Sequence, residues 1–355
     1  MKIIKRKLFL SALLFSVVSV GARAASIDFT TFVPSSSIGA VEGGDTSTIA
    51  FNYAGNKFVG SVYFDNQLFS TSLTGGSVAT FGAPLPESSS SVGEVVVAAS
   101  LGQAGFASGD IYAGSGADGK IYHFSNSGSS QSLFATLPGV AGSVRQIFFD
   151  PGSSFGGNML VTTSSGNIYK INSSGTVSLV TSVGEDTEGM DIATSAWGSF
   201  AGDLLVGSEG SGTIRLISPT GVITPVPLSF SGAETVSFVP LNLNGSDPLQ
   251  GFYVANYPTN MQFANASNFT GLLGDAIVTD EFGGSTMWDV HYNGTTFTRT
   301  PFTFTGNSIS QFEDGIFVTA QREVIGSPEP SSLLLVGSIL LFFGLRYILR
   351  RRVTA

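Results

Sequence analysis

Hydrophobic and polar residues along the chain form short runs instead of helical periods. Apolar runs such as "NMLVTT", "TIRLIS" and "VSFVP" are rich in β-branched residues and are separated by Gly, Ser and Asn. Side chains alternate between apolar and polar within residues 168–172, which places one face of a strand in a core. This pattern predicts an all-β protein. A low-complexity disordered chain is the alternative, and the ordered recurrence of the apolar runs argues against it.

The apolar runs belong to a repeat. Each repeat opens on a glycine followed by Asp or Asn (Asx). A second glycine lies eight or nine residues after this Asx, and a turn glycine lies about eighteen residues after it. The first three Asx residues, Asp110, Asn158 and Asp203, are 48 and 45 residues apart. A period of forty to fifty residues that holds several strands is typical of a β-propeller blade. The repeats open on Gly-Asx at Gly109, Gly157, Gly202 and Gly274.

An apolar strand precedes each repeat and is expected to be the innermost strand of its blade. Six such strands start at Ser47, Glu94, Val144, Glu188, Glu234 and Glu313. They predict a propeller of six four-stranded blades over residues 46–325, with five blades as the alternative. The strand order resembles that of NHL-type and gluconolactonase-like six-bladed propellers, over roughly residues 46–320 and by pattern only.

Two stretches do not follow the repeat. The interval from Asp203 to Asp275 is 72 residues, which breaks the period. Residues 241–272 are therefore either an insertion or part of a degenerate blade. Residues 25–45 precede the first repeat and are assigned to a separate N-terminal segment.

The N-terminus has the three parts of a secretory signal peptide. Four basic residues within positions 2–7 precede the apolar run from Leu8 to Val20, and Ala22-Arg23-Ala24 forms an A-x-A site. Residues 1–24 are predicted to direct export by the Sec route, with cleavage between Ala24 and Ala25.

The C-terminus, "GSPEPSSLLLVGSILLFFGLRYILRRRVTA" at residues 326–355, also has three parts. Pro328 and Pro330 keep the peptide around Glu329 extended. Residues 333–349 predict a helix of roughly 25 Å, which is short for a bilayer core of about 30 Å. The arginines at 350–352 place the C-terminus in the cytoplasm. We expect a short helix in the inner membrane before any processing.

This tail resembles the PEP-CTERM sorting signal. The resemblance implies recognition by exosortase, loss of the hydrophobic tail and a final place at the cell surface or outside the cell. It also implies a link to exopolysaccharide and biofilm. An ordinary membrane anchor is the alternative. The matching residues are Pro328, Glu329, Pro330, Ser331, the leucines from Leu333, and Arg350, Arg351 and Arg352.

The charge of the chain limits its classes of binding partner, and its cysteine content excludes disulfides. Without the leader and the four arginines of the tail, seven Lys and Arg remain against twenty-five acids, a formal charge of −18. An acidic exterior argues against nucleic acid and anionic lipid and is compatible with cations. The chain has no cysteine, so no disulfide supports the exported protein.

Few motifs carry chemistry. "GSGADG" at Gly114–Gly119 matches G-x-G-x-x-G, but a strand follows instead of the helix that a dinucleotide site requires, so a hairpin turn is predicted. The only histidines, His123 and His291, have no ligand neighbouring them in the sequence. "NLNGSD" at Asn242–Asp247 is predicted to be a turn, with calcium binding as the alternative. No catalytic residue is assigned.

One set of charged residues occupies equivalent positions at the start of the predicted inner strands. Such residues often ring the central channel of a propeller, where several carboxylates can hold Ca²⁺ or a cationic or sugar ligand. The alternative is that they are solvated strand ends partly paired with the arginine. The members are Glu94, Arg145, Glu188, Glu234 and Glu313.

Three classes of function follow. The first is a non-catalytic surface or matrix protein that interacts with exopolysaccharide or other cell-surface components. The second is a propeller hydrolase or lactonase with a channel metal. The third is a ligand-binding scaffold. No cofactor is expected beyond the calcium named above.

Overall fold

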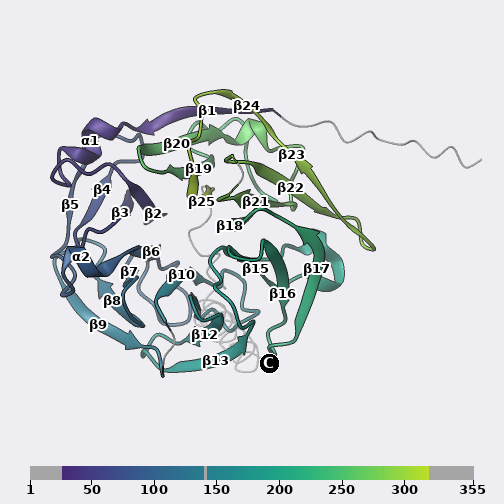
Figure 1. Ribbon diagram of the computed structural model, residues 1–355, viewed down its shortest axis with the longest axis horizontal. Helices are drawn as coiled ribbons and strands as arrows, with labels where there is room; N and C mark the ends of the chain where they lie inside the picture. Colours follow the sequence, from purple (N-terminus) through teal and green to yellow (C-terminus); the bar gives the residue numbers. More distant parts are fainter. Residues whose placement is uncertain (1–25, 140–141, 283, 320–355) are drawn as a thin grey trace, which may run out of the picture.

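The computed structural model describes residues 26–139, 142–282 and 284–319. Within them the strands form six sheets around a central channel (Figure 1), which confirms the predicted all-β propeller of six blades and excludes five. The innermost strands follow one another around the channel in the order β2, β6, β10, β14, β18, β25 and back to β2. They are the six strands that the sequence predicts as innermost.

The first four blades are consecutive in the chain, and each runs from its inner to its outer strand. Blade 1 contains β2 (Thr48–Tyr53), β3 (Phe58–Val62), β4 (Leu68–Thr71) and β5 (Ala79–Phe81). Blade 2 contains β6 (Val96–Ala99), β7 (Ile111–Gly114), β8 (Lys120–Phe124) and β9 (Gln131–Thr136). Blade 3 contains β10 (Val144–Phe149), β11 (Met159–Thr163), β12 (Asn167–Ile171) and β13 (Val177–Ser182). Blade 4 contains β14 (Met190–Ile192), β15 (Leu204–Ser208), β16 (Thr213–Ile217) and β17 (Ile223–Ser229).

The second glycine of the repeat closes the hairpin between the second and third strands of a blade. Gly212 has a φ of 62°, and a Cβ atom there would lie 1.8 Å from the carbonyl oxygen of Phe230. Gly166 has a φ of 76°, and its Cβ would lie 2.3 Å from the carbonyl oxygen of Glu185. Only glycine tolerates both the left-handed backbone and the close approach, which explains its regular spacing.

Blades 5 and 6 are interleaved. After β18 the chain crosses to blade 6 for β19 and β20, and it then returns to blade 5 for β21 to β23. The segment 241–272 therefore supplies two strands of the sixth blade, and this crossing lengthens the repeat interval to 72 residues. The strands of blade 5 are β18 (Ala233–Phe238), β21 (Ala276–Asp280), β22 (Met287–Tyr292) and β23 (Phe297–Pro301).

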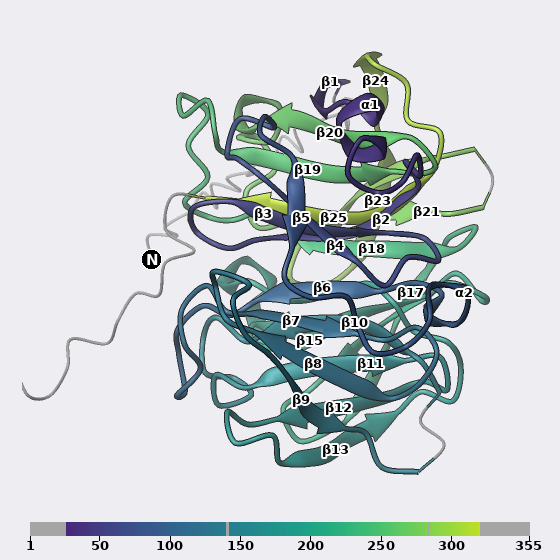
Figure 2. The same ribbon diagram turned by 90° about the vertical axis from the view of Figure 1, so that its left-hand side faces the viewer.

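Blade 6 joins both ends of the described chain and so closes the ring. The propeller also begins earlier than the repeat indicates, because the outer strand β1 lies within residues 25–45. β1 pairs antiparallel with β20 and parallel with β24, and Figure 2 shows β1, β20 and β19 side by side. From the axis outward, the blade contains β25 (Phe312–Val318), β19 (Gly251–Asn256), β20 (Asn260–Asn265), β1 (Ser26–Val33) and β24 (Thr303–Gly306).

The cores lie between neighbouring blades and are rich in aromatic side chains. All residues of β6 and β18 are buried, because inner strands have a blade on each side. Trp197 is fully buried, and its ring lies 4.8 Å from that of Phe238 between blades 4 and 5. Short helices fill the connections: α1 (Ser35–Gly39), α2 (Ser89–Val92), η1 (Ser195–Phe200) and η2 (Ala266–Asn268).

The predicted leader, its cleavage point at Ala24 and Ala25, the sorting signal and the helix at 333–349 lie outside the described residues. Among the residues that the structure does describe, no helix has the length and apolar character needed to cross a membrane.

The closure of blade 6 yields a stability prediction. Phe29 on β1 is fully buried, and its ring packs 5.6 Å from Phe304 and 6.2 Å from Phe312. We expect Phe29→Ala to lower the free energy of unfolding by about 3–5 kcal/mol, because it leaves a cavity where the ring closes. Ser26→Ala, an exposed change on the same strand, is the control for chemical denaturation. Equal stability of the two variants would show that β1 does not contribute to closure.

Candidate functional site

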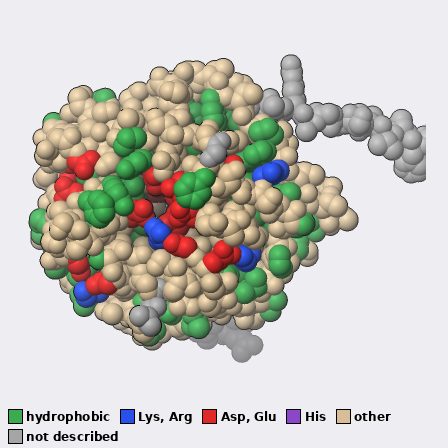
Figure 3. All heavy atoms as spheres, in the orientation of Figure 1, with side chains coloured by type: hydrophobic (Ala, Val, Ile, Leu, Met, Phe, Trp, Pro, Cys, Tyr) green, Lys and Arg blue, Asp and Glu red, His purple; other side chains and the backbone are tan. Residues whose placement is uncertain are grey.

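The charged residues predicted at the starts of the inner strands meet at one mouth of the channel. Figure 3 shows acidic side chains gathered around the central hollow, with a basic side chain among them. The cavity beneath has a volume of about 30 Å³. All five predicted residues line it: Glu94, Arg145, Glu188, Glu234 and Glu313.

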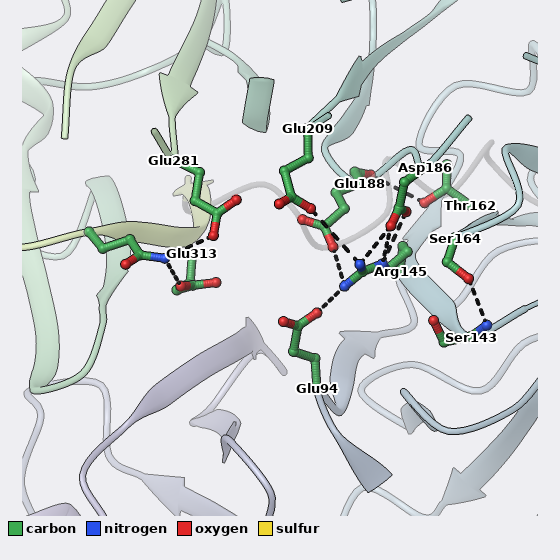
Figure 4. A network of polar contacts seen from close by, with 11 residues as sticks. Glu94, Ser143, Arg145, Thr162, Ser164, Asp186, Glu188, Glu209, Glu281 and Glu313 are labelled. Atoms are coloured by element: carbon green, nitrogen blue, oxygen red, sulfur yellow. Dashed lines mark hydrogen bonds and ion pairs between the residues drawn. The ribbon is translucent and has the colours of Figure 1, made fainter. Parts of the chain in front are cut away.

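Arg145, on β10, holds one side of this channel mouth together. Its Nε lies 3.0 Å from Oδ1 of Asp186, and its Nη2 lies 2.6 Å from Oδ2 of the same residue. Its Nη1 contacts Glu94 and lies 2.7 Å from Oε1 of Glu188. Nη2 is also 3.9 Å from Oε2 of Glu209. A single guanidinium thus faces four carboxylates (Figure 4), which raise its pKa. Among the predicted glutamates, Arg145 pairs with Glu94 and Glu188.

Three carboxyls of the channel mouth were missed by the sequence analysis. Asp186 precedes β14, whereas Glu209 and Glu281 directly follow the second strands β15 and β21. Second strands run antiparallel to inner strands, so their ends lie beside the starts of the inner strands. Glu209 and Glu281 also stand six residues after the Asx of their repeats. A comparison of that column would have found both.

Glu188 and Glu234 form the buried centre of the site. They are 8% and 6% exposed, and their carboxyls lie within hydrogen-bonding reach of each other. Burial raises the pKa of Glu188 to about 7 and that of Glu234 well above its usual range. Within the described part of the chain, no donor reaches Oε2 of Glu234. The pair therefore favours a shared proton or a bound cation over two bare charges.

Glu209 completes a possible metal-binding group. One oxygen from each of Glu188, Glu209 and Glu234 lies within 4.8 Å of the other two. Carboxylate oxygens are the ligands that hard cations such as Ca²⁺ prefer. A cavity of about 30 Å³ accepts an ion or one to two water molecules, but not a sugar ring.

The opposite side of the channel mouth carries further protonated carboxyls. Burial raises the pKa of Glu313 and of Glu281 to about 9, helped by the charges of Glu94 and Glu209 respectively. Nε2 of Gln311 donates to Oε1 of both, at 2.7 Å to Glu313 and 3.0 Å to Glu281. Figure 4 shows Glu281 and Glu313 across the channel from Arg145 and its carboxylate partners.

None of the other sequence candidates lines this cavity. The G-x-G-x-x-G match forms the hairpin between β7 and β8, as predicted. The two histidines each pair with the Asx of their own repeat: His123 Nε2 lies 2.7 Å from Asp110, and His291 Nδ1 lies 2.7 Å from Asp275. Residues 242–247 form turns.

No family model and no curated protein matches the chain. A solved chain of a nidogen/laminin complex is similar in structure, with a TM-score of 0.53, 11% identity, and coverage of 78% of this chain and 87% of that one. A structural genomics protein of unknown function from Bacteroides thetaiotaomicron has a TM-score of 0.50 and 11% identity, over 76% of this chain and 63% of its own. A streptogramin B lyase has a TM-score of 0.46 and 13% identity, over 79% and 88%. The first two likenesses support the fold alone, and the third carries no argument. The chain is thus a six-bladed β-propeller with an acidic channel mouth.

The raised pKa values yield a prediction of pH dependence. Glu188, Glu281 and Glu313 titrate above their unfolded value of 4.5. Their contribution is complete below pH 4.5 and is lost as the pH passes 7 and then 9, so stability falls as the pH rises. For the buried Glu188 alone the whole loss is roughly 3 kcal/mol, of which about 1 kcal/mol falls between pH 6 and 9 and lowers the melting temperature by about 3 °C.

The matched variants are Glu188→Gln and Asp28→Asn, where Asp28 is an exposed acid on β1. The amide resembles a protonated carboxyl, so Glu188→Gln should melt at a less pH-dependent temperature, whereas Asp28→Asn should follow the wild type. The assignment is wrong if Glu188→Gln retains the full pH dependence.

Proposed function

We propose that this chain is an exported, non-catalytic protein of the cell surface or extracellular matrix whose channel mouth binds cations. The observation that carries the proposal is the crowding of Glu188, Glu209 and Glu234 within 4.8 Å, where Arg145 pairs with Glu188 and Glu209 among the described residues. A cation would replace the protons that the buried carboxyls of Glu188 and Glu234 otherwise retain.

Export and sorting rest on the two termini. We propose that Sec exports the chain, that exosortase recognises the tail at the inner membrane, and that the processed protein acts near exopolysaccharide. The direction of β25 supports an orientation in which the channel mouth faces away from the attachment point. β25 begins at the acidic mouth with Phe312 and ends at Val318, so the described chain ends on the opposite face. Attachment through the tail would leave the acidic mouth pointing away from the attachment point.

A hydrolase or lactonase with a channel metal is the second candidate. Glu188 and Glu234 favour it, because two carboxyls that share a proton with pKa values near or above 7 can act as acid and base. Metal-dependent hydrolysis of lactones or esters, lost in Glu188→Gln, would support this function over the non-catalytic one.

The first prediction of this proposed function concerns calcium. A cation that binds only the folded state stabilises it, so calcium should raise the melting temperature of the purified full chain. At a hundredfold excess over its Kd, the free energy of unfolding should rise by about 2.7 kcal/mol. Its effect should grow with pH, since calcium displaces protons from the carboxyls.

Magnesium at equal concentration controls for general screening of an acidic protein. The double variant Glu188→Gln, Glu234→Gln should lose the response to calcium, and it should be no less stable than wild type without metal because it removes repulsion. Equal shifts with both metals that survive in the double variant would reduce the effect to surface screening.

The second prediction concerns sorting. Replacing Pro328-Glu329-Pro330 by alanines should block processing while export continues. Mass spectrometry of the mature C-terminus in the producing organism measures the effect, and Thr354→Ala is the control within the tail. An unchanged C-terminus in the triple variant would contradict the sorting proposal.

A further inference from the structure

Exposed aromatic side chains flank the acidic channel mouth. Phe64 follows β3 by two residues and is 50% exposed, and Phe282 directly follows Glu281 and is 48% exposed. The backbone N–H of Phe64 donates to the carbonyl oxygen of Gly93 at 3.0 Å, beside Glu94. Figure 3 shows hydrophobic side chains on both sides of the acidic hollow.

Phe64 is held in an unusual conformation. Its φ is 54°, in the left-handed region that bulky residues rarely adopt. Its ring lies 4.2 Å from that of Tyr63, which in turn lies 6.1 Å from the ring of Tyr257. The charges of Glu94 and Glu313 help raise the pKa of Tyr63, after burial as the main cause. Aromatic rings thus lie next to the carboxyls of the channel mouth.

The combination does not suit a bare metal ion alone. Calcium takes six to eight oxygen ligands and gains nothing from aromatic rings. An organic cation uses both features, because its charge binds carboxylates and its body lies on ring faces. The cavity of about 30 Å³ is large enough for an ammonium group and too small for the rest of such a molecule, which must lie on the rim.

Glu234 gives the ammonium group a partner. It is 6% exposed, lines the cavity, and has an Oε2 that no donor reaches among the described residues. A primary ammonium carries three N–H donors, which matches the three converging carboxyls of Glu188, Glu209 and Glu234.

We infer that the channel mouth binds a primary ammonium group carried by an organic molecule, with the ammonium among Glu188, Glu209 and Glu234 and the body against Phe64 or Phe282. This inference rests on the proposed cation-binding function and names its ligand. The ammonium belongs either to a free polyamine or to an amino sugar of a polysaccharide.

Isothermal titration of the purified full chain tests the inference with three probes: spermidine, a glucosamine trimer and an N-acetylglucosamine trimer. The last is the uncharged match of the second. We expect the acetylated trimer not to bind. Binding of spermidine alone would assign a free polyamine, and binding of the glucosamine trimer would assign an amino sugar; both support the inference.

Variants locate the binding. Glu234→Gln should weaken it at least about tenfold, because it removes a charge that the ammonium contacts. Phe64→Ala should weaken it about two- to fivefold, because the body of the ligand loses its packing against the ring. Leu179→Ala, an equally exposed apolar side chain on β13, is the control and should bind like wild type. Phe64 and Phe282 are exposed, so their variants test binding even if Glu234→Gln misfolds.

The possible failures are distinct. If calcium stabilises the protein but neither amine binds, the inference is wrong and the proposed function stands. If calcium does not stabilise the protein and neither amine binds, the inference and the proposed cation-binding function are both wrong. Amine binding that persists in Glu234→Gln and in Phe64→Ala, Phe282→Ala would be general attraction to an acidic surface, which also overturns the inference.

Discussion

Closure of the ring is the constraint on which the rest of the structure depends. Six inner strands pack around one axis, so residues at the same register of different blades must meet at the channel mouth. Closure relies on blade 6, which combines the first described strand, β1, with the pair β19 and β20 and with the last two strands, β24 and β25. Glu94 and Glu313 are 219 positions apart in the chain and reach one cavity only because this blade forms.

Closure brings like-charged carboxylates close together at the axis, where they repel one another. Two like charges about 4 Å apart cost about 4 kcal/mol at the effective dielectric constant of a protein surface, and burial adds to that cost. Arg145 offsets part of it for Asp186, Glu94 and Glu188. Glu281 and Glu313 keep their protons at neutral pH, because burial raises their pKa values to about 9. Such a site is prepared for a cation, since binding one removes the need for those protons.

The sequence predicts much of this arrangement where the signal repeats. The backbone geometry of each hairpin requires glycine at positions such as 166 and 212. The spacing of these glycines and of the Gly-Asx turns therefore predicts the blades. The starts of the inner strands align in the same way, so the sequence predicts that Glu188 and Glu234 occupy equivalent positions near the axis.

The rest could not be predicted because its causes are not local. β1 is a single strand without a repeat, and its place depends on pairing with β20, more than 200 residues away. The crossing of β19 and β20 into blade 6 interrupts the period without any sign of where the segment goes. Asp186 lies in a loop outside the repeat columns and joins the site only through Arg145. The aromatic rim was missed because exposed phenylalanines cannot be told from core ones in a chain so rich in them.

Several glutamates at the channel mouth stay protonated near neutral pH and release their protons to solvent when a cation binds; this is the central claim. Carboxyl ¹³C NMR of the glutamates, followed across the pH range with and without the bound cation, tests it most directly. The account predicts that the carboxyls of Glu188, Glu281 and Glu313, assigned through their glutamine variants, titrate near 7 to 9 in the free protein. Addition of the cation should move the titration of Glu188 to lower pH. Titration of every glutamate between about pH 4 and 5, unchanged by cations, would contradict the account.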